Sequence, residues 1–199
     1  MSRADSRRWR AARTPADLGD LMALWLEGGL GSRLGYEPRW GPDEETTELI
    51  PTLAALCRTG YITTCSQPGL ASTGANGGWW EQKAAVTGLV TDEALLDRLL
   101  RSAADIGMAT CVNHLRRRGG HQGQPIVVTT CDGQPVTAFG GRIRRADLAL
   151  EWADIHPRLF AQIATGTYLT IAAPTYGPTG QNLWHTLDAA SQLVTPTGL

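Results

Sequence analysis

Two short polar segments of this chain carry side chains that can hold a small molecule. Glu45 and Thr46 stand just before an apolar stretch of helical period, and Thr63-Thr64 runs into the polar turn Cys65-Ser66-Gln67-Pro68-Gly69. A carboxylate accepts hydrogen bonds and balances a cation, while threonine and serine hydroxyls both donate and accept. Free N–H groups at a helix start can receive an anion. We therefore predict that these segments form a site for a small polar ligand.

Two further residues are candidates for covalent or acid–base chemistry. Cys65 lies inside the turn, but the sequence shows no paired histidine or helix N-terminus that would lower its pKa, so a small buried residue is the favoured interpretation. His185 follows the loop of residues 174–181 and is the second candidate, whereas His114 is interpreted as structural. The four histidines and four cysteines show no metal-ligand spacing, so we expect no metal site.

Composition narrows the classes of partner. With 199 residues, 42% of them hydrophobic, the chain can bury one core, and we predict a single domain over residues 14–199. A formal net charge of −1 supplies no bulk field for nucleic acid or an anionic membrane. Isolated cysteines without a signal peptide favour a reduced cytoplasmic protein. No apolar run approaches the roughly 20 residues that span a bilayer.

Basic residues gather in two places. Residues 1–13 hold five arginines around Trp9, which favours a solvated flexible arm, with a phosphate-binding segment as the alternative. Arg116-Arg117-Arg118, just before Gly119-Gly120, is interpreted in the same way, as an exposed loop first and an anion site second.

Periodicity and turn residues place the elements that must position these side chains. Helices are predicted from Thr14 to Gly28, Leu49 to Gly60, Thr91 as N-cap to Gly107, Ala146 to Ala164 with a break near Pro157, and Leu183 to Leu193. Strands are predicted over residues 61–65, 80–89, 108–115, 126–130, 136–139 and 168–172, and loops over 30–42, 69–78 and 174–181. Asp132-Gly133 indicates a hairpin whose turn Gln134-Pro135 lengthens. Without a strict βαβ rhythm, we predict an α+β fold with a mixed β-sheet core flanked by helices.

These residues also carry a resemblance to a known family. Glu45-Thr46, sixteen residues, Thr63, and then Ser66-Gln67-Pro68 resemble the C-terminal regulatory domain of eukaryotic-type methylenetetrahydrofolate reductase. The likeness continues through Gln82-Lys83-Ala84, Asn113-His114-Leu115, Val136-Thr137 with Arg142, and Asn182-Leu183-Trp184, so it spans roughly residues 15–193. Short stand-alone proteins of actinobacterial type share the same serine-glutamine-proline turn.

The resemblance implies a ligand and its contacts. That regulatory domain binds S-adenosylmethionine and its product S-adenosylhomocysteine, so one of these is the expected cofactor. The family's ligand contacts fall on Glu45, Thr46, Thr63, Ser66 and Thr137 of this sequence. Alone, Glu45-Thr46 could be an ordinary helix N-terminal turn, and Thr63 and Ser66 a strand followed by a hydroxyl-stabilised turn.

The sequence departs from the family in three ways that bear on function. It carries no folate- or flavin-binding barrel, so reductase activity is not expected. Cys65 stands where the family has an asparagine, and His185 replaces a glutamine after Trp184. The stretch after Thr137 is shortened, so the pose of the ligand can differ from that in the family.

Three functions stay open at this point. The first is a stand-alone sensor that binds S-adenosylmethionine or S-adenosylhomocysteine and changes its contacts with a protein partner. The second is an S-adenosylmethionine-dependent methyltransferase acting on a small-molecule methyl acceptor. The third is an interaction module that has lost the ligand, against which the joint presence of Glu45, Thr46, Thr63 and Ser66 argues.

Overall fold

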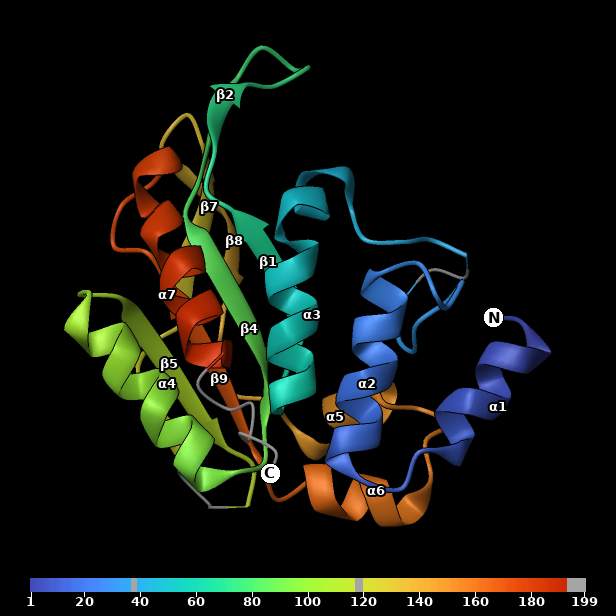
Figure 1. Cartoon of the computed structure of the whole chain (residues 1–199). Helices are drawn as coiled ribbons and strands as arrows, with labels where there is room; N and C mark the ends of the chain where they lie inside the picture. The colour runs from blue at the N-terminus through green and yellow to red at the C-terminus, as the bar shows by residue number, and fades with distance from the viewer. Residues whose placement is uncertain (37–38, 117–119, 193–199) are drawn as a thin grey trace.

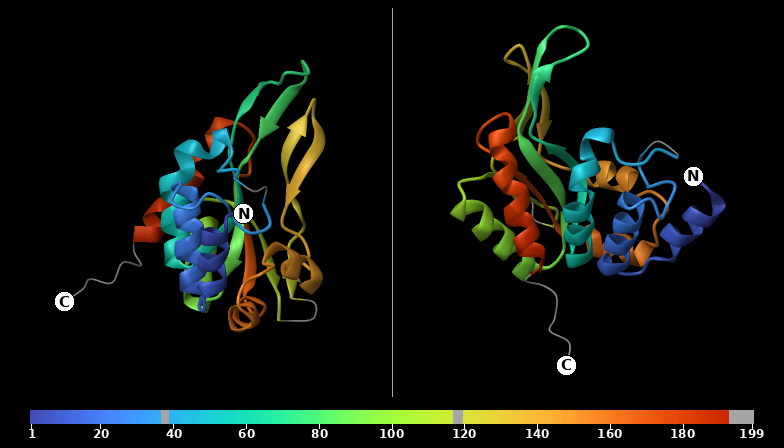
Figure 2. Two further views of the ribbon diagram at one scale, coloured as in Figure 1. Left: turned by 90° about the vertical axis from the view of Figure 1, so that its right-hand side faces the viewer. Right: turned by 45° about the horizontal axis from the view of Figure 1, so that its top comes forward.

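The chain folds as a layer of helices, a five-stranded sheet and a four-stranded sheet, as Figures 1 and 2 show. The structure is a computed structural model, and it describes residues 1–36, 39–116 and 120–192. Within these residues, no helix is long and apolar enough to cross a membrane. The predicted loop at Arg116–Gly120 falls largely on residues 117–119, and the predicted helix end at Leu193 also lies outside the described residues.

The elements have the following bounds. The helices are α1 (Arg3–Ala11), α2 (Pro15–Leu26), the 3₁₀ helix η1 (Glu44–Leu49), α3 (Ile50–Thr59), α4 (Glu93–Asp105), α5 (Arg145–Glu151), α6 (Pro157–Ile163), the 3₁₀ helix η2 (Pro178–Gln181) and α7 (Asn182–Gln192). The strands are β1 (Tyr61–Pro68), β2 (Ala71–Thr73), β3 (Trp79–Gln82), β4 (Ala84–Val90), β5 (Ala109–His114), β6 (His121–Gln122), β7 (Ile126–Cys131), β8 (Gln134–Phe139) and β9 (Thr167–Ala172).

Both sheets are antiparallel over the described residues. The larger sheet has the order β1-β4-β9-β5-β6, and the smaller has the order β2-β3-β7-β8. The α+β class is confirmed, but the expected mixed sheet is wrong. Strands β4 and β5, which α4 connects, run in the same direction but are not neighbours, because β9 lies between them and is antiparallel to both. Helices α3, α4 and α7 lie on one face of the larger sheet, and the β7–β8 hairpin lies on the other (Figures 1 and 2).

Local signals set most helix ends. Thr14 and Asp17 form a reciprocal capping box at α2, with Pro15 in the first turn. Gly60 ends α3 with φ 102°, in the left-handed region that favours glycine. The predicted N-cap Thr91 is wrong by one residue, because the carboxylate of Asp92 accepts from the N–H of Leu95 at 2.6 Å.

Two strand predictions need correction. The predicted strand at 80–89 divides at Lys83, whose N–H donates to the carbonyl of Val128, so β3 joins the smaller sheet and β4 the larger one. In the β7–β8 hairpin, Asp132 and Gly133 form the turn with φ 49° and 74°. Gln134 and Pro135 belong to β8 instead of lengthening the turn, because an Asp-Gly pair at positive φ suffices for a two-residue turn.

The predicted N-terminal arm is a helix over residues 3–11. Its Trp9 is fully buried, and the indole N–H donates to the carbonyl of Ser32 at 3.0 Å. Ser2 caps the helix by accepting from the N–H of Asp5. The five arginines led to the prediction of a flexible arm. One buried tryptophan is enough to hold a short helix whose other residues face water.

Candidate ligand-binding site

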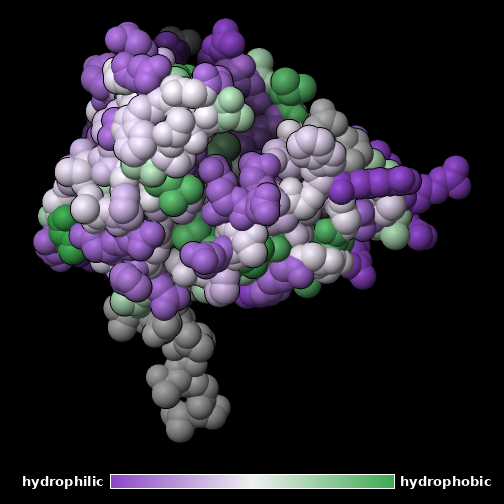
Figure 3. Space-filling view, turned by 90° about the horizontal axis from the view of Figure 1, so that it is seen from above, coloured by the Kyte–Doolittle hydropathy of each residue, from purple (hydrophilic) through white to green (hydrophobic). Residues whose placement is uncertain are grey.

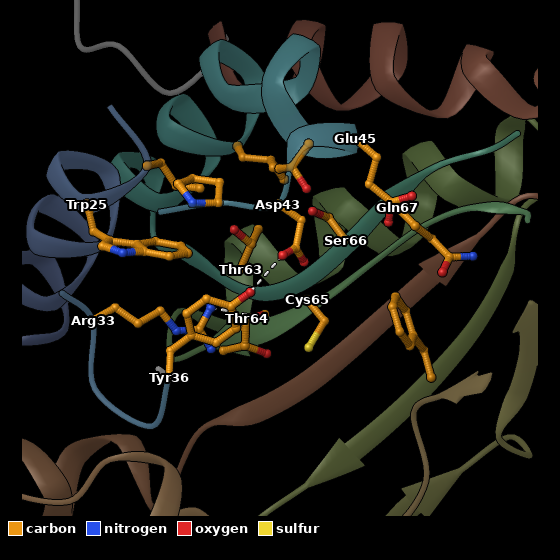
Figure 4. A pocket seen from close by; sticks show the side chains of 15 residues that line it. Trp25, Arg33, Tyr36, Asp43, Glu45, Thr63, Thr64, Cys65, Ser66 and Gln67 are labelled. Carbon is orange, nitrogen blue, oxygen red and sulfur yellow. Dashed lines mark hydrogen bonds between the residues drawn. The ribbon is translucent and has the colours of Figure 1, made fainter. Parts of the chain in front are cut away.

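A cavity of about 250 Å³ runs along the free edge of β1, and we call it the edge cavity (Figure 4). β1 is the outermost strand of the larger sheet, so its edge is open to neighbouring loops. The cavity is lined by Trp25, Leu26, Arg33, Tyr36, Pro42, Asp43, Glu45, Thr46, Leu53, Thr63, Thr64, Cys65, Ser66, Gln67 and Phe139. Four of the five predicted ligand contacts therefore share one cavity: Glu45, Thr46, Thr63 and Ser66.

A bulge in β1 distributes the side chains around this edge. Thr63 pairs with Gly88 and Cys65 pairs with Thr87, so Thr64 has no residue opposite it in the register of β4. One inserted residue moves the following side chains to the opposite face. Thr63 consequently faces α3, where its hydroxyl lies 3.3 Å from the Cys57 sulfur, whereas Cys65 faces the smaller sheet.

The short helix η1 brings Glu45 and Thr46 to the cavity. It precedes α3 directly, and Pro51 lies in the first turn of α3. Thr46 is buried, whereas Glu45 is exposed at the cavity rim and accepts a hydrogen bond from the side-chain amide of Gln82 at 3.2 Å. Glu45 therefore presents a carboxylate to an incoming ligand.

A cation lies at the other end of the cavity (Figure 4). The guanidinium of Arg33 lies 5.2 Å from the ring centres of both Trp25 and Tyr36, and it donates to the carbonyl of Thr64 at 2.9 Å. No salt bridge within the described residues involves Arg33. Trp25 and Tyr36 contact each other edge to face, with ring centres 5.6 Å apart, and the guanidinium packs against both rings. These contacts hold it in place to receive a carboxylate or phosphate.

A second acidic side chain lies near this cation. Asp43 accepts from the hydroxyl of Tyr36 at 3.0 Å, and burial, reinforced by that hydrogen bond, raises the pKa of the Tyr36 phenol. The cavity thus presents a cation and carboxylates along its length, an arrangement that matches a zwitterionic ligand.

The other predicted site residues have different outcomes. Thr137 lies on β8 with its side chain exposed, and it lines neither the edge cavity nor a second cavity that adjoins it. His185 is exposed on α7 and also lies outside both cavities, because Trp184 packs inward and donates to the carbonyl of Pro68 at 3.3 Å. Cys65 does line the cavity and is exposed there, so the favoured interpretation as a buried residue is wrong. Surrounding protein atoms still raise the pKa of its thiol by desolvation, which disfavours the nucleophilic thiolate.

Gln67 lies in β1, which continues to Pro68, so the predicted polar turn beginning at Cys65 is wrong. Its side-chain amide donates to the carbonyls of Lys83 and Val128 at 3.0 and 2.7 Å, and its carbonyl accepts from the hydroxyl of Thr129 at 3.1 Å. These bonds tie β1 to β7 across the two sheets. The glutamine therefore fixes the position of the end of β1, which carries Ser66.

A second cavity of about 220 Å³ lies on the face of the larger sheet, and we call it the face cavity. It is lined by Thr64, Cys65, Thr87, Cys111, Asn113, Ala138, Phe139, Gly140, Gly141, Ile143, Glu151, Tyr168 and Thr170. Thr64, Cys65 and Phe139 line both cavities, so the two share a wall. Within the part of the chain that the structure describes, no group of three His, Cys, Asp or Glu side chains could hold a metal ion.

Glu151 is the acidic group of the face cavity. Its carboxylate accepts from the Tyr168 hydroxyl at 2.5 Å, and that hydroxyl in turn accepts from the indole N–H of Trp152 at 3.0 Å. Burial raises the pKa of Glu151, although the Tyr168 hydrogen bond and the charge of Arg33 oppose that rise.

The raised pKa of Glu151 predicts a pH-dependent stability difference. Because the folded state holds this proton more tightly than the unfolded chain, the contribution of Glu151 is complete below its ordinary pKa and is lost as the pH rises through the folded pKa. We expect Glu151→Gln to gain stability relative to the parent protein as the pH increases from about 4 to 8. Urea unfolding of both proteins across that range measures the two free energies of unfolding. If the free energy of Glu151→Gln minus that of the parent protein fell as the pH rose, the assignment would be contradicted.

Sequence reasoning missed several residues of these cavities. Arg33 and Tyr36 belong to the segment 30–42, which has no periodicity, and only their residue types could have suggested a site. Glu151 ends a short helix, and no sequence signal connects it with Tyr168.

Comparison with known proteins identifies a family. Residues 4–194 match the family described as a domain of unknown function (DUF6919). The chain belongs to the DUF6919 family. A search of curated proteins found no significant match. The DUF6919 description assigns no function, so the resemblance to the methylenetetrahydrofolate reductase regulatory domain stays a prediction.

Proposed function

We propose that this DUF6919 domain binds S-adenosylmethionine or S-adenosylhomocysteine in the edge cavity. The observation that carries the proposal is that Glu45, Thr46, Thr63 and Ser66, distributed over two elements, line one cavity. The resemblance selects these residues for ligand contact, and the same cavity contains Arg33. At about 250 Å³ the cavity lies just below the usual range for small-molecule sites, about 300–1,000 Å³, so an adenosyl ligand would extend beyond its rim.

The charges of the cavity suit the parts of this ligand. Arg33 would pair with the carboxylate of the amino-acid tail, and Asp43, near it through Tyr36, would accept from the ammonium group. Glu45, at the opposite end of the cavity, would accept from the ribose hydroxyls (Figure 4). The threonine and serine hydroxyls between them would complete the polar contacts.

A sensor needs a segment that responds to the ligand. Gln82 links Glu45 to the loop 174–181, because its side chain donates to Glu45 and its carbonyl accepts from the N–H of Gly177 at 2.8 Å. A ligand that donated a hydrogen bond to the Glu45 carboxylate would compete with Gln82 for this acceptor and favour a different arrangement of this loop. Such a difference between the two states would let a protein partner read the ligand.

The second candidate is an S-adenosylmethionine-dependent methyltransferase. The observation that favours it is the face cavity, which shares Thr64, Cys65 and Phe139 with the edge cavity and could place an acceptor beside the sulfonium. Proximity and orientation supply most of the acceleration for an already activated methyl group.

Thermal unfolding with each ligand tests the proposal. At about 100 times Kd the ligand should add about 2.7 kcal/mol, which raises Tm by about 5–10 °C for a chain of this length. Glu45→Gln should remove much of that shift, whereas Glu48→Gln, the same change in the same 3₁₀ helix but outside the cavity lining, should keep it. No shift with either compound would refute ligand binding. Formation of S-adenosylhomocysteine beyond one equivalent in the presence of acceptors would favour the transferase, and binding without turnover would favour the sensor.

A further inference from the structure

The face cavity contains a hydrogen-bond donor that the protein does not satisfy. Asn113 is 6% exposed and lines this cavity, and its side-chain amide nitrogen has no partner among the described residues. Buried amide groups are nearly always paired, because an unmade hydrogen bond leaves the full desolvation cost uncompensated. An unpaired donor that faces a cavity therefore points to a ligand that carries an acceptor.

Two acceptors accompany this donor. The hydroxyl of Thr170 donates to the hydroxyl of Thr87 at 2.9 Å, which leaves the lone pairs of the Thr170 oxygen available. Glu151 accepts one hydrogen bond from Tyr168, and its carboxylate has capacity for more. Asn113 and Tyr168 pair across β5 and β9, so the donor and the Tyr168–Glu151 pair lie in adjoining positions of the sheet.

The roof of the cavity is apolar and closely fitted. Phe139 and Ile143 supply its larger apolar side chains. Gly140 has φ 82°, and a Cβ there would lie 2.8 Å from the Cys111 sulfur. The chain after β8 therefore passes so close to the larger sheet that a side chain at this position would clash. Only a small molecule fits between this roof and the strands.

We propose that the face cavity binds a small amine that also carries a hydroxyl or carbonyl oxygen, with its ammonium group at Glu151 and its oxygen at Asn113. The acidic side chain disfavours an anion, and a cation would offset the cost of keeping the Glu151 carboxylate charged in this half-buried place. The apolar roof favours a ligand with a hydrophobic body. This proposal goes beyond binding in the edge cavity and does not require it.

The amine would also be the methyl acceptor if the transferase alternative holds, and this step alone rests on the proposed function. The Glu151 carboxylate would first take one proton from the bound ammonium group, which frees the nitrogen lone pair. The nitrogen would then form a bond to the sulfonium methyl carbon as the carbon–sulfur bond breaks. The electron pair of that bond would stay on sulfur and leave the neutral thioether. The methylated nitrogen would then carry the positive charge that the sulfonium has lost.

Binding of three matched probes to the full chain tests the site. The probes are 2-amino-1-phenylethanol, 1-phenylethanol, which lacks the amine, and benzoate, which is an anion. We expect saturable binding of the amino alcohol by calorimetry, at least about tenfold weaker binding of 1-phenylethanol, and no binding of benzoate. Equal binding of all three probes, or no binding of the amino alcohol, would overturn the proposal.

Two variants assign the contacts. Asn113→Leu keeps the approximate shape but removes the unpaired donor, so it should weaken the amino alcohol about tenfold while leaving the free protein at least as stable. Glu151→Gln should weaken the amino alcohol and leave 1-phenylethanol unchanged. Amino alcohol binding that neither variant weakens would refute the assignment.

S-adenosylmethionine titrations of the same proteins separate the two proposals. Asn113 does not line the edge cavity, so the Tm shift with S-adenosylmethionine should persist in Asn113→Leu. If S-adenosylmethionine caused no Tm shift in the parent protein while the amino alcohol bound, the proposed function alone would be refuted. The converse result would refute the face-cavity site alone.

Discussion

Replacing Arg33 by glutamine is expected to weaken S-adenosylmethionine binding by about 10- to 100-fold. The substitution removes a charge-assisted hydrogen bond to the ligand carboxylate, and such bonds contribute about 1.5–3 kcal/mol. Arg33 already packs against Trp25 and Tyr36, so the free protein orders the guanidinium before the ligand arrives. Calorimetric titration of Arg33→Gln and the parent protein measures the difference.

A ligand without a carboxylate provides the sharpest control. 5′-Methylthioadenosine keeps the adenosine and thioether but lacks the amino-acid tail, so Arg33→Gln should leave its affinity nearly unchanged. Arg33→Lys should bind S-adenosylmethionine more weakly than the parent protein, because lysine retains the charge but not the planar, stacked fork. Arg101→Gln, the same change at an exposed position of α4, should have no effect. Equal losses for both ligands in Arg33→Gln would show that Arg33 only supports the cavity wall.

Replacing Trp9 by alanine is expected to destabilise the protein by about 3–5 kcal/mol. The substitution empties a fully buried indole position and removes the hydrogen bond to the carbonyl of Ser32. For a chain of this length, each kcal/mol lowers Tm by about 2–4 °C, so a loss of roughly 6–20 °C is expected. Thermal and urea unfolding measure it.

The neighbouring arginine is the matched control for Trp9. Arg10 forms an exposed ion pair with Asp154 at 3.3 Å, and such pairs contribute about 0–1 kcal/mol. Arg10→Ala should therefore change Tm by only a few degrees. If Trp9→Ala and Arg10→Ala behaved alike, α1 would be a peripheral arm, as the arginine-rich sequence predicts.

Local patterns were sufficient where a short segment determines its own structure. The capping box at Thr14, the glycine at Gly60 and the Asp132-Gly133 turn each act through neighbouring backbone groups, and the structure confirms all three elements. Lys83 shows the limit of such patterns. The segment 80–89 has no Pro or Gly at Lys83 to mark a break, and only pairing with Val128 decides that it divides between two sheets.

The sequence by itself determined the α+β class and the segments that hold Glu45, Thr46, Thr63 and Ser66. Both follow from patterns of neighbouring residues, and such patterns can be recognised without knowledge of the tertiary contacts. Only the tertiary structure brought Arg33 to the same cavity and joined Glu151 to Tyr168. Those contacts depend on which edge of the sheet stays open and which loop covers it. Long-range pairing decides both, and no periodicity within a segment records it.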